Sequence, residues 1–383
     1  MRYVRLWARE QQETATKPGP TRPLRLIRTA SSLCFMSTPL SKLRIALVGA
    51  GAMGSLHARV IAQSQDAELV CVVDPDRASG EALAEHWRSK WVPELDSFRG
   101  IDGVIVASPT NSHVAWAARA IDADVPVLVE KPISDDLALT DALLARAGAR
   151  GVPMTCGLLE RFNAALCTAL EIVDDPVLVK TVRHSHHPAR IQTGVSYDLL
   201  IHDVDFVLRM AGAMPDSLNA HFGAVDPGSP SGVEDVTEAT LRFDGGMLAT
   251  LSANRISQRK VRTLVVNELN RLVEVDLVRQ DVTVYRHIEG DWLDGQGGGV
   301  RQQTVIDIPV VQNLREPLAG QLDHFIALAS GQLDAGTELA GLRAPHAVVD
   351  EIIESAGGSA TPTTCPPEDE RNGQERKNRA LSR

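Results

Sequence analysis

The chain has 383 residues and a formal net charge of −10 at pH 7, from 39 lysines and arginines against 49 aspartates and glutamates. This length is enough for two domains with cores of their own, and the acidic balance argues against nucleic acids and anionic membranes as partners. Hydrophobic residues make up 44% of the chain without an apolar run long enough to span a membrane, which is typical of a globular protein.

The first 41 residues differ in composition from the rest of the chain. They carry seven basic residues against only Glu10 and Glu13, and they lack the apolar core of a secretory signal. The segment is either an arginine-rich transit peptide or the result of a start codon assigned too early, with Met36 as the natural start. In both cases we expect residues 1–41 to be disordered, as we do the Pro- and Glu-rich tail 357–383.

The five cysteines are scattered, and none has C-x-x-C spacing: they are Cys34, Cys71, Cys156, Cys167 and Cys365. This pattern is typical of a reducing compartment and indicates neither a disulfide framework nor a zinc site. We therefore expect a cytoplasmic protein.

Residues 43–76 organise the first half of the chain. An apolar strand at 43–48 is followed by G-x-G-x-x-G at 49–54, a helical pattern at 55–64 and a second strand at 68–73 that ends in Asp74. This order is the fingerprint of a dinucleotide-binding turn, since Asp74 lies 20 residues past Gly54, where a carboxylate accepts the ribose hydroxyls of adenosine. The charge of Asp74 favours NAD over NADP, although Arg77 keeps NADP from being excluded.

Each residue of the turn has a physical task. Gly49 permits the tight turn, Gly51 lets the backbone approach a pyrophosphate, and Gly54 lets the helix pack close to the strand. The free N–H groups of Ala52 and Met53 at the helix start are expected to face the phosphates, with the helix dipole behind them.

The alternation of strands and helices continues to residue 157 and predicts a parallel sheet. The expected helices are 78–87, 113–123 and 137–149, and the expected strands are 101–107, 125–129 and 152–157. Asn111 or Ser112 is the expected N-cap of the second helix, and Asp135 or Asp136 of the third. Because ligands bind at the carboxyl ends of such strands, we place the glycine turn, Asp74, the 110–113 loop and Lys131 on one rim.

After Gly157 the pattern changes to strands joined by short turns, which predicts a largely antiparallel sheet. The expected strands are 177–185, 218–225, 236–243, 247–253, 261–266, 272–275 and 282–286, and the expected helices are 161–173, 197–211, 318–330 and 343–355. Asp244-Gly245-Gly246 is a hairpin signal. The expected fold is therefore an α/β N-terminal Rossmann domain (42–158) with a mostly parallel doubly wound sheet, plus an α+β C-terminal domain (159–356) with a large, mainly antiparallel open sheet.

Three side chains are candidates for catalysis. Asp198 and His202 are four residues apart on a predicted helix, so they share a face, and a carboxylate beside an imidazole suits a general base near neutral pH. Lys131 ends a buried strand on the cofactor rim, where its ammonium can hydrogen-bond a substrate hydroxyl. Asp203 and Asp205 are expected to be capping or solvated, with a place at the domain interface as the alternative for Asp205.

A histidine cluster at His184, His186 and His187 lacks an Asp, Glu or Cys at ligand spacing. We interpret it as sheet or surface histidines and expect no metal.

Several stretches in the same order resemble the glucose–fructose oxidoreductase / inositol dehydrogenase (Gfo/Idh/MocA) family. They are VGAGAMGSLHA (48–58), VVDPD (72–76), ASPTNSHVAWAARAI (107–121), VEKPIS (129–134), CGLLERFN (156–163) and DLLIHDVDFVL (198–208). The resemblance covers about 43–355. Within the family, residues 198–205, 252–254 and 260–262 are most similar to UDP-N-acetylglucosamine 3-dehydrogenase-type members, although Ala164 stands where those relatives often have proline.

This resemblance implies an NAD-dependent oxidoreductase acting on CH–OH groups. Lys131 matches the lysine near the nicotinamide and the substrate, His202 the catalytic histidine and Asp198 the acid one turn before it. The cofactor site then comprises Gly49, Gly51, Ala52, Met53, Gly54, Asp74, Thr110, Asn111, His113, Glu130 and Lys131. Arg161 and Asn163 match positions that face the substrate in some sugar-nucleotide members, and the family's open sheet implies a homodimer or homotetramer.

The expected substrate is a sugar or nucleotide sugar whose secondary alcohol is oxidised. Two alternatives stay open: an inositol or free-sugar dehydrogenase, and a non-catalytic NAD(H)-binding sensor on the same fold. Retention of Lys131, Asp198 and His202 favours an enzyme, because a pure binder needs none of them. Arg183, Arg190, Arg255 and Arg262 are candidates for holding a diphosphate.

Overall fold

The computed structural model describes residues 42–186, 193–226, 229, 232–294, 297–312 and 315–357, with the backbone alone at 290–294 and 297–301. From Leu43 onward the described residues belong to one compact unit. The disorder expected for residues 1–41 and for the tail from 358 onward concerns segments outside this part of the chain, as do the predictions for His187 and Arg190. Within the described residues, no helix is both long and apolar enough to cross a membrane.

Six parallel strands form the first sheet, in the spatial order β3-β2-β1-β4-β5-β6. Their bounds are β1 Leu43–Val48, β2 Ala67–Val73, β3 Lys90–Val92, β4 Gly103–Val106, β5 Val127–Val129 and β6 Met154–Cys156. The chain starts in the middle of this order, so the strand order reverses between β1 and β4. In such doubly wound sheets the ligand binds at the carboxyl ends of the strands beside that switch point.

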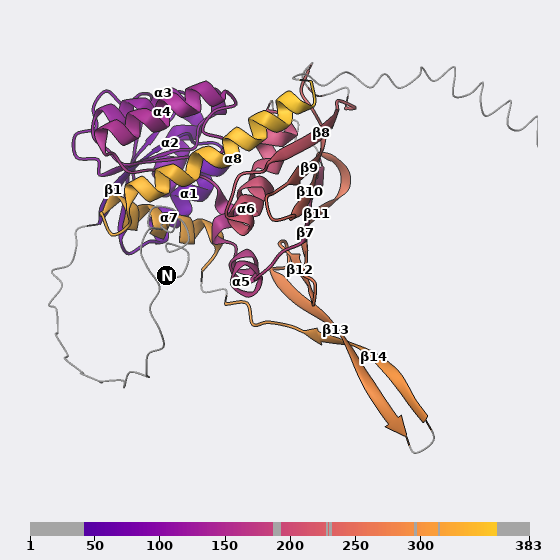
Figure 1. Ribbon diagram of the computed structural model, residues 1–383. Helices are drawn as coiled ribbons and strands as arrows, with labels where there is room; N and C mark the ends of the chain where they lie inside the picture. Colours follow the sequence, from indigo (N-terminus) through magenta and orange to yellow (C-terminus); the bar gives the residue numbers. More distant parts are fainter. Residues whose placement is uncertain are drawn as a thin grey trace, which may run out of the picture. The chain divides into compact units, whose positions relative to one another are not determined.

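Helices cover both faces of this sheet (Figure 1). They are α1 Ala52–Gln63, α2 Arg77–His86, α3 Thr110–Asp122, α4 Leu137–Arg150, α7 Pro317–Ala329 and α8 Ala335–Ser355. Ile45 and Leu47 of β1 pack in one cluster with α1 and α7, while Ala46 and Val48 pack in another with α3, α4 and α8. The alternation of strand side chains thus buries β1 on both faces, and two late helices return to complete the layers.

The boundaries differ from the predictions in a few places. β3 was not expected, because three residues are too few to show periodicity. The predicted cap of α3 is wrong: the helix begins at Thr110 after Pro109, and neither Asn111 nor Ser112 caps it. Asp136 does cap α4, accepting hydrogen bonds from the amides of the first turn.

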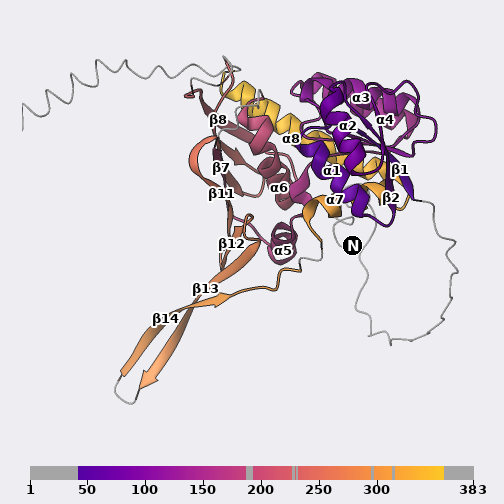
Figure 2. The same ribbon diagram turned by 180° about the vertical axis from the view of Figure 1, so that it is seen from behind.

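Eight strands form the second sheet, in the order β14-β13-β12-β11-β7-β10-β9-β8, and only β7 and β10 are parallel. Their bounds are β7 Leu178–His186, β8 Ser217–Gly223, β9 Val236–Arg242, β10 Leu248–Asn254, β11 Ile256–Asn267, β12 Leu272–Asp276, β13 Asp281–Asp294 and β14 Gly297–Asp307. The predicted antiparallel sheet is confirmed, as is the β9–β10 hairpin, in which Gly245 and Gly246 have φ of 87° and 95°. β14 was missed because its glycines and glutamines have low β-propensity; it pairs with β13 in a ribbon that extends beyond the other strands (Figures 1 and 2).

Two helices differ from the predictions in ways that affect the site. The expected helix 161–173 is a short 3₁₀ turn, η3 (Leu159–Phe162), followed by α5 (Ala164–Ile172), and Asn163 is the N-cap between them. The expected helix 197–211 begins with a π-helical turn, η4 (Ser196–Leu200), and continues as α6 (Ile201–Ala211). A π turn takes more residues per turn than an α-helix, so the spacing of Asp198 and His202 does not follow the α-helical rule. The domain boundary expected at 158/159 stays a prediction.

Candidate active site

The glycine turn between β1 and α1 has the shape that a dinucleotide needs. Gly49 has φ of 101°, and a Cβ there would lie 2.6 Å from the carbonyl oxygen of Ala107. A Cβ at Gly54 would lie 1.9 Å from the carbonyl oxygen of Gly49, whereas one at Gly51 would meet nothing within 4 Å. Gly49 and Gly54 are thus fixed by the protein's own packing, and the open space beside Gly51 at the start of α1 fits a pyrophosphate.

Asp74 is held beside this turn at the end of β2. Its Oδ2 accepts a hydrogen bond from the amide of Ala50 at 2.7 Å, and its Oδ1 accepts one from the amide of Asp76 at 2.8 Å. The carboxylate therefore keeps a fixed position from which it can accept ribose hydroxyls and repel a 2′-phosphate. Arg77 is the residue because of which the sequence did not exclude NADP. Its side chain pairs with Glu81 at 2.9 Å and lies over the Trp91 ring.

The start of α3 lies at the end of β4 on the same rim. Thr110 is half-buried and Asn111 is exposed. His113 is buried instead, with Nδ1 2.8 Å from the carbonyl oxygen of Pro132 and Nε2 2.8 Å from that of Ser108. Both ring nitrogens contact the protein, so the geometry gives His113 the task of joining this loop to the Lys131 turn rather than of touching a cofactor.

Glu130, which precedes Lys131, also points inward. Its Oε1 lies 2.7 Å from Nε2 of His57 on α1, and both side chains are buried. A Cβ on Gly157 would lie 2.5 Å from the other carboxylate oxygen, so glycine is needed to make room for Glu130. The pair links the cofactor helix α1 to the strand end that carries Lys131, and no sequence signal singled out His57.

Lys131 and Asp198 meet, although 67 residues separate them. The lysine Nζ donates to the backbone oxygen of Asp198 at 2.6 Å and to its Oδ1 at 2.7 Å. Oδ2 of Asp198 lies 3.4 Å from Nη2 of Arg255, a side chain with 0% exposure. An ammonium has three donors, so Lys131 keeps one N–H for another oxygen.

His202 is half-buried on the first turns of α6, and its Nδ1 is buried without a hydrogen-bond partner among the described residues. Burial lowers the pKa of this imidazole well below its ordinary value, and the positive charges of Arg183, Lys131, Arg262 and Arg161 lower that pKa further. His202 is therefore neutral at pH 7 and able to accept a proton. No hydrogen bond from His202 to Asp198 is found in the described part of the chain, so this geometry does not support the pairing that their spacing of four residues suggested.

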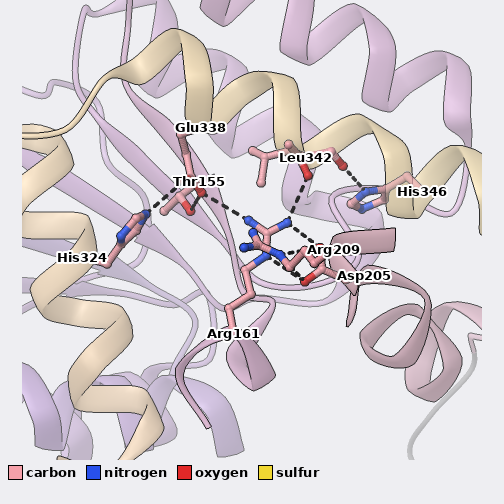
Figure 3. A network of polar contacts seen from close by, with 9 residues as sticks. Thr155, Arg161, Asp205, Arg209, His324, Glu338, Leu342 and His346 are labelled. Carbon is pink, nitrogen blue, oxygen red and sulfur yellow. Dashed lines mark hydrogen bonds and ion pairs between the residues drawn. The ribbon is translucent and has the colours of Figure 1, made fainter. Parts of the chain in front are cut away.

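Arg161, predicted to face the substrate, lies in a buried network (Figure 3). Its Nε and Nη2 donate to the two carboxylate oxygens of Asp205 at 2.9 and 2.7 Å, and Nη2 also donates to the carbonyl oxygen of Gly341 at 3.0 Å. Glu338 lies 3.5 Å from Nη1. The expectation of a capping or solvated Asp205 is wrong, since its side chain is buried in this network, and its alternative, a place at the domain interface, stays a prediction.

The side chain of Asn163 also forms its hydrogen bonds within the protein. Its Oδ1 accepts from the amide of Ala165, and its Nδ2 donates to Glu160 at 3.0 Å and to the carbonyl oxygen of Leu277 at 3.3 Å. The substrate contacts expected for Arg161 and Asn163 stay predictions without support from these contacts.

A second buried network was missed by sequence reasoning. Arg183 on β7 donates to both carboxylate oxygens of Asp203 at 2.9 Å and to Glu160 at 2.8 Å, and Arg262 on β11 lies 3.4 Å from Glu160. The expectation that Asp203 is capping or solvated is wrong. The alternation of the strand could have predicted this burial, because Arg183 lies on the same face of β7 as the buried residues Val179 and Thr181.

The histidine pair of β7 has ordinary contacts. Nε2 of His184 lies 2.8 Å from the Ser252 hydroxyl, and His186 is exposed. Among the residues that the structure describes, no group of three His, Cys, Asp or Glu side chains is placed to hold a metal. Cys71 and Cys156 are buried and free, and burial raises the pKa of both thiols.

Models of one protein family match both halves of the chain. Residues 43–158 match the family model described as "Oxidoreductase family, NAD-binding Rossmann fold", and residues 174–272 match "GFO/IDH/MocA C-terminal domain". Together the two models of this family match more than half of the chain.

Named relatives are dehydrogenases. The chain is 26% identical over 293 residues to UDP-N-acetylglucosamine 3-dehydrogenase of Acidithiobacillus ferrooxidans, covering 74% of this chain and 88% of that protein. It is 30% identical over 227 residues to the myo-inositol dehydrogenase Hyg17 of Streptomyces leeuwenhoekii, covering 55% and 69%. The solved Acidithiobacillus enzyme has the same fold, with a TM-score of 0.70 at 24% identity over 82% of this chain and 98% of that one. The chain therefore belongs to the Gfo/Idh/MocA family of oxidoreductases, with an NAD-binding Rossmann domain.

Proposed function

We propose that this protein is a dehydrogenase that oxidises a secondary alcohol of a sugar or nucleotide sugar. The observation that carries the proposal is the contact of Lys131 with Asp198, which brings the end of a first-sheet strand to the turn that precedes His202. The positive charge of Lys131 is also among the causes that lower the pKa of His202, which supports a site shared by the two side chains. A donor and a neutral proton acceptor beside a dinucleotide turn are the groups that alcohol oxidation needs.

The residues divide the work as follows. NAD, when bound, supplies the hydride acceptor, and Gly49, Gly51, Gly54 and Asp74 would hold it. His202, neutral because of its lowered pKa, takes the proton of the substrate hydroxyl. The free N–H of Lys131 donates to the same oxygen and stabilises the negative charge that develops there. Asp198 fixes the direction of Lys131 rather than that of His202.

Within this class of substrates, our first candidate is a nucleotide sugar similar to UDP-N-acetylglucosamine. The 26% identity over 88% of a UDP-N-acetylglucosamine 3-dehydrogenase supports it. An inositol is the second candidate, because shorter matches to inositol dehydrogenases reach 30% identity. The homo-oligomer and the cytoplasmic location expected from the sequence stay predictions; light scattering of the purified chain tests the first.

The experiment is NADH formation followed by absorbance with UDP-N-acetylglucosamine, myo-inositol and free sugars. His202→Ala is expected to reduce kcat about 10²- to 10⁴-fold, as for loss of a general base, with NAD affinity unchanged. His221→Ala, which removes an exposed histidine on β8, is the matched control and should keep full turnover. Turnover of His202→Ala at the wild-type rate would contradict the mechanism.

The pH profile gives an independent check. Because the pKa of His202 is lowered, its neutral form persists below pH 6.5, so the acid limb of kcat/KM should have its midpoint below 6.5. In Lys131→Met, which removes one of the charges that lower this pKa, the acid limb of the residual activity should move upward. An acid limb above pH 6.5 in the wild type would exclude His202 as the base.

A further inference from the structure

Five cationic side chains form one cluster. Four of them, Lys131, Arg183, Arg255 and Arg262, lie in ion pairs with carboxylates near His202, and the fifth, Lys260, is exposed on β11 two residues before Arg262. Ion pairs join four of them to three carboxylates, those of Glu160, Asp198 and Asp203. Among the described residues Lys260 has no ion-pair partner, so this set carries two positive charges more than its paired carboxylates neutralise.

The register of the second sheet adds to this excess. Arg262 of β11 lies directly opposite Arg183 of β7, and like charges at directly opposed positions destabilise a sheet. Glu160 is shared between them, at 2.8 Å from Arg183 and 3.4 Å from Arg262. One carboxylate thus serves two guanidinium groups.

Several donors of the cluster are also unused. Nε and Nη1 of Arg255 and Nε of Arg262 are buried and lack a hydrogen-bond partner in the described part of the chain. Arg255 is completely buried beside Asp198, and Arg262 is 30% exposed. Buried donors without partners are rare in native proteins, and each calls for a ligand, a water or an ion.

Repulsion between like charges also affects the pKa values of the same residues. The charge of Arg262 lowers the pKa of Lys260, and burial and Arg183 lower that pKa further. Burial, followed by the charge of Arg183, also lowers the pKa of Arg262. Arg183, which shares Glu160 with Arg262, also pairs with Asp203, the residue that follows His202, so the cluster lies beside the proposed reaction site.

We propose that Lys260 and Arg262, backed by Arg255, bind an anionic group of the substrate, so that the substrate of this site carries a phosphate ester or a carboxylate. The inference rests on the proposed dehydrogenase, because it assigns the substrate class of that same site. A neutral polyol would leave the excess charge and the unused donors without partners.

The test measures binding by calorimetry to the full chain with NAD saturating, so that added anions cannot occupy the glycine turn. The probes are glucose 1-phosphate, glucuronate and glucose, which separate a phosphate ester from a carboxylate and from a neutral sugar. At least one anionic probe should bind more tightly than glucose. Lys260→Ala and Arg262→Gln should weaken that binding about 10- to 100-fold, as for loss of a charged hydrogen bond, whereas Arg262→Lys should retain most of it.

Lys90→Ala is the charge-matched control, since Lys90 is exposed at the amino end of β3, away from the rim. It should bind the anion within twofold of the wild type. Lys260 is exposed, so its substitution leaves the fold intact even if Arg262→Gln does not. Equal affinity of glucose and both anions, or an unchanged affinity in Lys260→Ala, would overturn the inference. Anion binding without any NADH formation would support this subsite and count only against the proposed function.

Discussion

The residues on the cofactor rim have different roles, and the contacts of each residue show which role it has. Gly54 is needed by the protein itself, because a Cβ would overlap the carbonyl oxygen of Gly49. Gly51 is surrounded by open space and is needed only by what binds there. The sequence motif gives both glycines the same weight, and the structure distinguishes them.

This distinction predicts different outcomes for two similar substitutions. Gly54→Ala should lower both the free energy of unfolding and the affinity for NAD, since backbone atoms must shift. Gly51→Ala should leave the stability without NAD nearly unchanged and still weaken NAD binding, because its methyl group occupies the space beside the first turn of α1. Thermal melts with and without NAD separate the two effects. A Gly51→Ala chain that binds NAD as the wild type does would remove Gly51 from the cofactor site.

At the scale of elements, one short turn is held by three helices. Residues 130–133 carry Lys131, and buried histidines from α1, α3 and α8 each contact one residue of the turn: His57 the Glu130 side chain, His113 the Pro132 carbonyl and His346 the Ile133 amide. These contacts fix the strand end from which the ammonium reaches Asp198. A displacement of a catalytic group by about 1 Å can reduce the rate 10²-fold, so such support has functional value.

His346 makes this turn sensitive to acid. Burial lowers its pKa to about 4, against an ordinary value of 6.5, and its unprotonated Nε2 accepts a hydrogen bond from the Ile133 amide. The unfolded chain takes up the proton below pH 6.5 and the folded chain does not. Stability is therefore fully present above pH 6.5 and declines as the pH falls toward 4, by up to about 3 kcal/mol from this group.

We expect His346→Gln to lower the free energy of unfolding at pH 7 by about 1–3 kcal/mol through the lost hydrogen bond. The same variant should show a flatter decline of stability between pH 6.5 and pH 4. Urea titrations at several pH values measure both, with His221→Gln as an exposed control. An identical pH dependence in His346→Gln and the wild type would refute this account.

At the scale of the whole molecule, buried ion pairs join segments far apart in the chain. Arg161 after β6 binds Asp205 of α6, while Glu338 of α8 accepts from Thr155 of β6 and contacts His324 of α7 (Figure 3). Burial by itself would raise the pKa of Glu338, but the His324 hydrogen bond and the Arg161 charge lower it to about 2. The network thus stays ionised at neutral pH and links β6 of the first sheet, and α6, to the helices α7 and α8 that return from the chain end.

Breaking this network from one side should be costly. Arg161→Met is expected to reduce the free energy of unfolding by about 3–5 kcal/mol, because it leaves buried carboxylates without their counter-charge. Arg146→Met, which breaks an exposed pair with Asp122, should cost less than about 1 kcal/mol. Chemical denaturation measures both. The double variant Arg161→Met/Asp205→Asn should lose less than the sum of its parts, and strict additivity would argue against a direct pair.

The two sheets differ in how much of their structure can be predicted from the sequence. The sequence predicts the Rossmann half because its local signals agree. Apolar strands, a glycine turn, Asp74 at 20 residues past Gly54 and the helix cap Asp136 all favour the same fold. The sequence also predicts that the second half is a sheet, but it does not predict β14. This glycine-rich strand forms because it pairs with β13, and its own β-propensity is low.

By itself, the sequence determined the dinucleotide turn and the parallel and antiparallel sheets, and it singled out Lys131, Asp198 and His202 as candidates. Only the tertiary structure decided what each of them contacts. Asp198 turned out to bind Lys131 rather than His202, and Arg161 to bind the buried Asp205 of α6 rather than to face a cleft. The physical reason is that spacing along the chain fixes neighbours one turn away, whereas a buried charge takes its partner from whichever segment the fold brings within hydrogen-bond distance.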